Sequence, residues 1–248
     1  MAKRNISRRE FIKTTGVTGI TSAVALAGLS NLSFGQSTTK ETKSESVKVP
    51  TRVYGKTKVP VSSLCLGGIF DITANLIELK KALDWGVTYW DTANSYVGGN
   101  SELGIGMYFD KFPQARKQVF LVTKTGGRDS ARMTSHLNTS LERMKTDYID
   151  LLFIHGISSP NEMTPEIKEW AEKAKSSGKI KFFGFSTHNN MADCLIGASK
   201  LGWVDGCMFT YNFRIMHENN MKTAVEACQK AGIGMTAMKT QGGGQVKT

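Results

Sequence analysis

The chain has 248 residues, of which 40% are hydrophobic, and it carries a formal net charge of +11 at pH 7. This hydrophobic share suffices for a sizeable core, and the mean hydropathy of −0.24 excludes a polytopic membrane protein. Because the sequence shows no nucleic-acid-binding motif, we interpret the positive charge as a solvated basic surface and expect no nucleic-acid partner.

The first 35 residues resemble a bacterial export signal. Ser7–Lys13 reads SRREFIK, in which twin arginines precede an aromatic residue, an aliphatic residue and a lysine, the pattern of the twin-arginine route. The apolar run behind it, AVALAGL, is far shorter than the roughly 18 residues of a membrane-spanning helix. We therefore expect residues 1–35 to be read by the twin-arginine export machinery and removed after Gly35, which implies a periplasmic or extracellular protein without a stable membrane anchor. A disordered basic tail is the alternative.

The polar residues 36–50 have no apolar period and are predicted to form a disordered linker. From residue 51 to residue 248, apolar runs alternate with amphipathic stretches, which predicts one domain of alternating strands and helices. The predicted strands are 62–68, 87–91, 119–124, 149–155, 180–186, 204–212 and 232–239. The predicted helices are 75–86, 102–112, 133–145, 165–178, 191–202 and 218–232. Such a pattern indicates a parallel α/β sheet covered on both faces.

Two architectures fit this pattern, a doubly wound sheet and a (β/α)8 TIM barrel. A doubly wound nucleotide-binding sheet normally carries GxGxxG after its first strand, whereas this chain has LGGIFD there. The barrel is therefore favoured. The four cysteines are not spaced as metal ligands or as a disulfide framework, so we expect buried thiols and no metal site.

Polar residues end several predicted strands, where a barrel places its chemistry. Asp91, Lys124 and His155 end three successive strands, so they should meet at one mouth, with Tyr96 in the loop just beyond Asp91. A carboxylate can keep a buried lysine charged, and an ammonium stabilises a phenolate, so this set would make Tyr96 a better acid. A histidine can orient a substrate oxygen. The set suits protonation of a carbonyl oxygen, while the hydride must come from a nicotinamide.

These residues resemble the aldo-keto reductase family. The resemblance rests on DTANSY (91–96), LVTK (121–124), DLLFIH (150–155), GKIKFFGFS (178–186) and MFTYN (208–212), and it covers about residues 51–240. It implies reduction of an aldehyde or ketone, including sugar-like substrates, with NADPH or alternatively NADH. It also implies that Tyr96 is the general acid, that Lys124 and Asp91 assist it, and that His155 binds the carbonyl oxygen.

The resemblance further implies a nicotinamide site at the ends of the last strands. Ser186 matches the serine that holds the carboxamide, whereas Met208 stands where many members have glutamine. Met238 and Lys239 stand where a stacking tyrosine is common. The STH and AMK variants resemble a branch whose members often carry an iron–sulfur segment, and the corresponding cysteines are not in this sequence.

The number of strands and two lysines at strand ends leave alternatives to a complete reductase open. The sequence holds about seven of the eight expected strands, which suggests a fragment of a longer working enzyme. A barrel that binds a nucleotide or a partner without turnover is the main alternative. A Schiff-base aldolase is a lesser one, because Lys124 and Lys239 both stand at strand ends.

Overall fold

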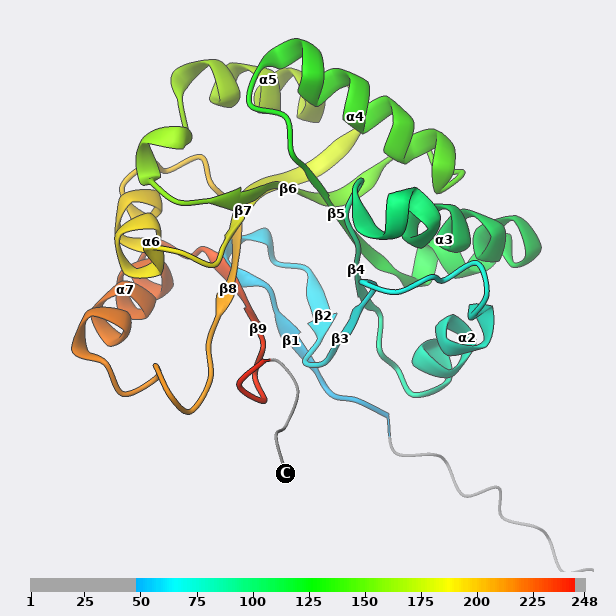
Figure 1. The fold of residues 1–248 in the computed structure, drawn as a ribbon, viewed down its shortest axis with the longest axis horizontal. Coiled ribbons are helices and arrows are strands. Elements are labelled where there is room, and N and C mark those ends of the chain that lie inside the picture. The colour runs from blue at the N-terminus through cyan, green and yellow to red at the C-terminus, as the bar shows by residue number, and fades with distance from the viewer. Residues whose placement is uncertain (1–47, 244–248) are drawn as a thin grey trace, which may run out of the picture. The chain divides into compact units, whose positions relative to one another are not determined.

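Seven parallel strands form one curved sheet. The computed structural model describes residues 48–243, which all belong to one structural unit, and each strand pairs with the next in chain order. The strands are β3 (Cys65–Gly67), β4 (Tyr89–Asp91), β5 (Phe120–Thr125), β6 (Ile149–Ile157), β7 (Ile180–Thr187), β8 (Gly206–Thr210) and β9 (Gly234–Met238). Figure 1 shows the sheet curling, with the helices on its outer side. The barrel-type fold with about seven strands is therefore confirmed.

A helix follows each of the first six strands of this sheet. The helices are α2 (Leu76–Asp84), α3 (Asn100–Lys111), α4 (Ser130–Arg143), α5 (Pro165–Ser176), α6 (Met191–Ser199) and α7 (Asn219–Lys230). The sequence of α5 shows why such a helix forms. The Thr164 hydroxyl accepts the Ile167 N–H at 3.3 Å, Pro165 takes the first helical position, and Gly178 turns the chain away at φ +75°. Its buried residues recur every three or four positions and face the sheet.

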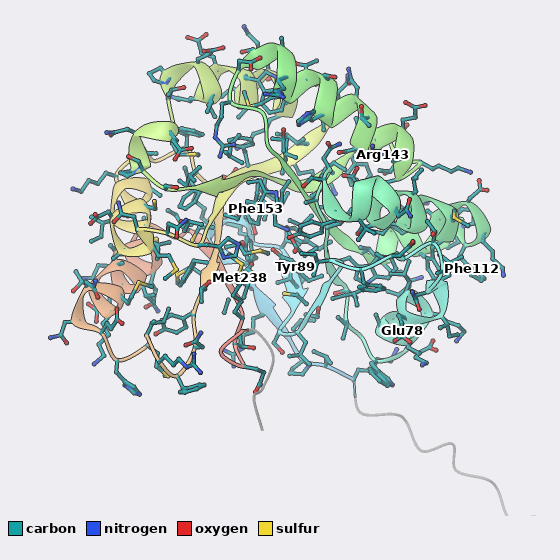
Figure 2. All side chains as sticks on the ribbon, in the orientation of Figure 1. Glu78, Tyr89, Phe112, Arg143, Phe153 and Met238 are labelled. Atoms are coloured by element: carbon teal, nitrogen blue, oxygen red, sulfur yellow. The ribbon has the colours of Figure 1, made fainter. Side chains whose placement is uncertain are left out.

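The sheet separates two apolar layers, because successive side chains of a strand point to opposite faces. Along β6, Leu151 and Phe153 belong to the inner cluster, while Leu152 and Ile154 belong to the outer cluster beneath the helices. Figure 2 labels Phe153 with Tyr89 on the inner, concave side of the sheet. Full burial of each such side chain stabilises the fold by about 1.5–3 kcal/mol.

A hairpin that the sequence did not predict closes one end of the curved sheet. It consists of β1 (Thr51–Val53) and β2 (Pro60–Ser62), joined by a short turn. Tyr54 follows β1 and donates to or accepts from the Thr236 hydroxyl at 3.2 Å. Gly234, the first residue of β9, makes room for it, because a Cβ there would lie 2.2 Å from the tyrosine ring. The hairpin therefore covers the amino-terminal ends of the strands and leaves the carboxyl-terminal ends open.

Within residues 48–243, β3 and β9 are the edge strands of the sheet. A cavity of about 750 Å³ lies between them, lined among others by Leu64, Cys65, Tyr89 and Ala237. Cys65 is exposed at this edge, which corrects the expectation of a buried thiol, because β3 has a neighbour on one side only. The other three cysteines are buried as expected.

Some predictions fall outside the described residues. These are the export signal of residues 1–35, most of the linker predicted for residues 36–50, and the last five residues of the chain. The domain limits drawn from the sequence therefore stay predictions.

Candidate active site

The carboxyl-terminal ends of β4 and β5 bring Asp91 and Lys124 into a buried ion pair. The Lys124 Nζ lies 2.6 Å from one carboxylate oxygen of Asp91 and 2.7 Å from the other. A further Nζ proton reaches the Thr92 carbonyl at 2.8 Å. Only 2% of the lysine side chain and 11% of the aspartate side chain are exposed. The predicted pairing of these two strand ends is therefore present, and it fixes the ammonium in place.

Burial and pairing act on the aspartate in opposite directions. Burial raises the pKa of the Asp91 carboxyl, whereas the Lys124 ammonium lowers it through its charge and its hydrogen bonds. The bidentate contact requires a carboxylate that faces an ammonium, because a neutral pair would lose both charge-assisted bonds. Removing either partner alone would leave an uncompensated charge inside the protein.

The loop after β4 places Tyr96 over this pair. The Lys124 Nζ lies 3.3 Å from the phenol oxygen and 4.8 Å from the ring centroid. The three residues that follow, Val97, Gly98 and Gly99, all have positive φ. Val97 is β-branched and seldom adopts such a backbone, so the loop holds a conformation that its surroundings must stabilise. The sharp turn brings the hydroxyl back to the ammonium.

A buried network behind the loop supplies that stabilisation. The Glu102 side chain is fully buried on α3 and accepts from the Thr123 hydroxyl at 2.7 Å and from Arg143 Nη1 at 3.3 Å. Arg143 also donates to the Asn94 carbonyl at 2.8 Å, just before Tyr96. Gly99 lies against the Arg143 guanidinium and has φ +104°, a backbone conformation that favours glycine. The sequence does not reveal this network, because Glu102 and Arg143 are 41 positions apart.

His155 completes the set from β6. Its ring meets the Tyr96 ring edge to face, with centroids 5.7 Å apart and planes at 75°. Burial, followed by the charges of Lys124, His188 and Arg128, lowers the pKa of His155 to about 4. The imidazole is therefore neutral at pH 7 and carries one N–H that can donate to an oxygen in the mouth.

The residues predicted to hold a nicotinamide lie on β7, β8 and β9. Ser186 is buried near the end of β7, and its hydroxyl oxygen accepts the Gly156 N–H at 3.0 Å. Met208 pairs in register with Ser186, but its side chain is buried in the inner cluster. Met238 ends β9, packs against the same cluster and is labelled in Figure 2, whereas Lys239 follows it and is exposed.

Comparison with known proteins identifies the family of this chain. A sequence profile described as the Aldo/keto reductase family matches residues 70–248. The chain belongs to the aldo/keto reductase family. It is 31% identical over 158 residues to a Schizosaccharomyces pombe protein named aldo-keto reductase yakc [NADP(+)]. The aligned region covers 56% of this chain and 46% of that protein. It is 29% identical over 217 residues to the uncharacterized oxidoreductase YrpG of Bacillus subtilis. This alignment covers 77% of this chain and 66% of that protein.

Solved structures support the fold of this aldo/keto reductase family member. A putative aldo-keto reductase of Pseudomonas aeruginosa superposes with a TM-score of 0.66 at 24% identity, covering 78% of this chain and 79% of that one. The holo form of an aldo-keto reductase of Bacillus halodurans gives the same TM-score and identity, covering 76% and 65%. The chain thus spans about half to two thirds of the length of the first two curated relatives given above.

Two further features bear on this family member. Among residues 48–243, no cluster of three or more histidine, cysteine or acidic side chains is placed to hold a metal ion. Within the same part of the chain, no helix has both the length and the apolar character needed to cross a bilayer.

Proposed function

We propose that the protein reduces an aldehyde or ketone to an alcohol with NADPH, and that Tyr96 is the general acid. One observation carries the proposal. The Lys124 ammonium contacts the Asp91 carboxylate and the Tyr96 hydroxyl at once, at 2.6 Å and 3.3 Å, with the neutral His155 ring against the tyrosine. These groups come from three neighbouring strands and converge at the end where barrels of this type place their chemistry.

The proton balance follows from this geometry. NADPH, when bound, supplies the hydride that goes to the carbonyl carbon. Tyr96 gives its hydroxyl proton to the carbonyl oxygen, so the alcohol forms and a phenolate remains. Lys124, held in place by Asp91, stabilises the negative charge that develops on the phenol oxygen. Solvent then returns a proton to Tyr96.

His155 is the proposed orienting group. A neutral imidazole donates one hydrogen bond without adding a positive charge beside Lys124. This fits a pKa of about 4, because the ring stays neutral through the physiological range. The hydrogen bond would hold the carbonyl oxygen close to the Tyr96 hydroxyl and so favour a reactive geometry.

The ends of β7 to β9 fit a nicotinamide nucleotide in their chemistry. Because the Gly156 N–H uses an oxygen lone pair of Ser186, the hydroxyl hydrogen remains to donate to a carboxamide. His188 and Lys239 are exposed at the ends of β7 and β9 and can face phosphate groups. The S. pombe relative named for NADP(+) supports NADPH as the reductant, with NADH as the alternative. Ser186, Lys239, Met208 and Met238 remain the proposed cofactor residues, the two methionines through packing.

Turnover with a panel of small aldehydes, ketones and sugars tests the proposal, with NADPH oxidation followed by absorbance. Tyr96→Phe should abolish oxidation, because the phenyl ring keeps its packing but has no proton to give. Binding of NADPH, followed by fluorescence, should persist. Full activity of Tyr96→Phe would refute the assigned acid.

The alternatives give different results in the same assays. A non-catalytic nucleotide-binding barrel would bind NADPH without oxidising it with any carbonyl compound. A Schiff-base aldolase would be trapped on a lysine by borohydride in the presence of its carbonyl substrate. The ion pair argues against Lys124 as the Schiff-base lysine, which must be neutral, and leaves Lys239 as the lysine that borohydride would trap.

We also propose export by the twin-arginine route, on the strength of Arg8 and Arg9 within Ser7–Lys13. Replacing both arginines by lysine keeps the charge and removes the twin-arginine pattern. Retention of the variant in the cytoplasm, with the unaltered protein in the periplasm or medium, is the expected result. Equal export of both proteins would contradict it.

A further inference from the structure

We infer that Arg128 is a positioning residue, which aims the His155 ring at Tyr96 by binding the His155 backbone carbonyl just beyond the last residue that β6 pairs with β5. The inference rests on the proposed function, because it assigns a purpose to the orientation of His155. Arg128 itself lies outside the set of residues that we propose to touch substrate or cofactor.

The first step is the bulge itself. Between Ile154 and Ile157, β6 advances three residues while its neighbour β7 advances two, from Phe185 to Thr187. The extra length falls at His155 and Gly156, which have no register partner on β5 or β7. Gly156 has φ +70°, the left-handed conformation that glycine adopts at such bulges. His155 therefore stands where the regular pairing of β6 stops, so its orientation depends on contacts other than the strand ladder.

The second step is the accounting of the freed backbone groups. Beyond Ile154 the backbone of β6 has no regular ladder partner until Ile157, although His155 is half-buried and Gly156 is exposed. The Ser186 hydroxyl accepts the Gly156 N–H at 3.0 Å, and Arg128 Nη2 donates to the His155 carbonyl at 2.8 Å. Two side chains from neighbouring elements therefore hold the bulge on either side of the peptide bond that follows His155.

The third step is what holds Arg128. Its Nε donates to Glu162 at 3.0 Å, and its Nη1 reaches the carbonyls of Gly126 and Gly127 at 3.4 and 3.3 Å. The other oxygen of Glu162 accepts the Ser158 N–H at 2.7 Å, in the loop after β6. The guanidinium thus ties the loop after β5 to the loop after β6 in a planar fork that a lysine cannot reproduce.

The positive charge of Arg128 acts on His155 in addition to its hydrogen bond. The Tyr96 ring lies against the His155 ring, and the charges that act on the imidazole come from Lys124 on β5, His188 after β7 and Arg128 itself. The positive charge of Arg128 opposes protonation of the imidazole, in addition to burial and the charge of Lys124. Geometry and charge can be separated by comparing Arg128→Met, which loses both, with Arg128→Lys, which keeps the charge.

The test measures turnover and, in cofactor-free protein, the nuclear magnetic resonance signals of the His155 ring. Arg128→Met should lower kcat by about 10²-fold, the scale expected for a misplacement of about 1 Å. It should also raise the pKa of His155 and weaken the nuclear Overhauser effect between the His155 and Tyr96 rings. Arg128→Lys should lower kcat less and leave the pKa low. Arg132→Met, an exposed arginine on α4 with no side-chain hydrogen bond to the described residues, should change nothing.

The outcomes separate this inference from the proposed function. If the unaltered protein reduces no carbonyl compound, the proposed function fails, and the ring signals still decide whether Arg128 positions His155. An unchanged Overhauser effect and an unchanged pKa in folded Arg128→Met would overturn the inference, even if stability fell. Should Arg128→Met fail to fold, Arg128→Lys carries the test, and an unchanged kcat together with an unchanged Overhauser effect would overturn it.

Discussion

The strand ends of β4 to β6 and those of β7 to β9 differ in how their polar side chains are held. At the first region, Asp91 and Lys124 are buried and joined by two short contacts, and Glu102 and Arg143 fix the loop above them. At the second region, Lys239 is exposed and Met208 is part of the apolar interior. The difference indicates that the groups proposed for proton transfer are already held by the protein, whereas the proposed cofactor side combines the buried Ser186 with an exposed lysine. Substitutions should therefore have larger effects on stability in the first region.

The largest loss of stability is expected from Lys124→Met. Lys239→Met is the matched control in the second region. The first variant leaves the Asp91 carboxylate buried without its partner, which should cost about 3–5 kcal/mol in the free energy of unfolding and abolish reduction. The second variant removes an exposed ammonium and should stay within about 0.5 kcal/mol. Urea unfolding measures both. Equal losses of unfolding free energy in the two variants would contradict the proposed difference between the two regions.

The double variant Asp91→Asn/Lys124→Met sharpens this result. It removes both charges together, so most of the lost stability should return, while reduction stays absent. A double variant as unstable as Lys124→Met alone would show that shape, not charge, is what the pair contributes.

A smaller loss of stability is expected from a substitution in the buried network behind the Tyr96 loop. Glu102→Gln replaces a buried carboxylate that faces Arg143, and it should lower the free energy of unfolding by about 1–3 kcal/mol. Turnover should fall as well, because Arg143 also holds the Asn94 carbonyl before Tyr96. Glu169→Gln, at an exposed site on α5, is the control and should be neutral. Thermal melting and kcat decide between a network that positions Tyr96 and a purely structural one, which would lower stability and leave kcat unchanged.

The stability of the protein in acid should depend on the half-buried His155. The folded protein holds the pKa of His155 at about 4, whereas an unfolded histidine titrates near about 6.5. Between these values the unfolded chain binds a proton that the folded protein does not, so stability falls as the pH drops through this window. His155→Asn should flatten that part of the dependence of the urea midpoint on pH. Burial also lowers the pKa of His188, but this residue is more exposed, and His188→Asn should change the slope less.

The smallest effect is expected at Met208. Its side chain lies in the inner cluster, and leucine has a similar volume, so Met208→Leu should cost less than about 1.5 kcal/mol. If the methionine serves the cofactor only through packing, the affinity for NADPH should not change. A marked loss of affinity in a stable variant would place the side chain in direct contact with the nucleotide.

The sequence predicted the parts of this fold that follow from periodicity and from strand ends. The apolar runs located all seven sheet strands, and their polar last residues located Asp91, Lys124 and His155, because parallel strands share one carboxyl-terminal edge. The roles given to these residues stay predictions. The β1–β2 hairpin was missed because its strands have three residues each and show no clear alternation.

The sequence could not show which charges are buried together. Glu102 and Arg143 are 41 positions apart, and only the packing of α3 against α4 and β5 brings them into contact. Arg128 was missed for the same reason. A signal for the bulge was nevertheless present, since Gly156 interrupts an apolar strand directly after His155, and an isolated glycine in a strand often marks a bulge.

The most direct test of the central claim is a thermodynamic cycle on the residual kcat/KM for carbonyl reduction, measured at high enzyme concentration because each variant retains only trace activity. Its legs are Tyr96→Phe, the charge-free pair Asp91→Asn/Lys124→Met, and the three substitutions combined. If Lys124 and Asp91 act through the Tyr96 hydroxyl, the combined variant should lose no more than Tyr96→Phe alone, because groups that act as a unit are not additive. If the losses multiply, the ion pair acts independently of the tyrosine, and the proposed proton transfer is wrong.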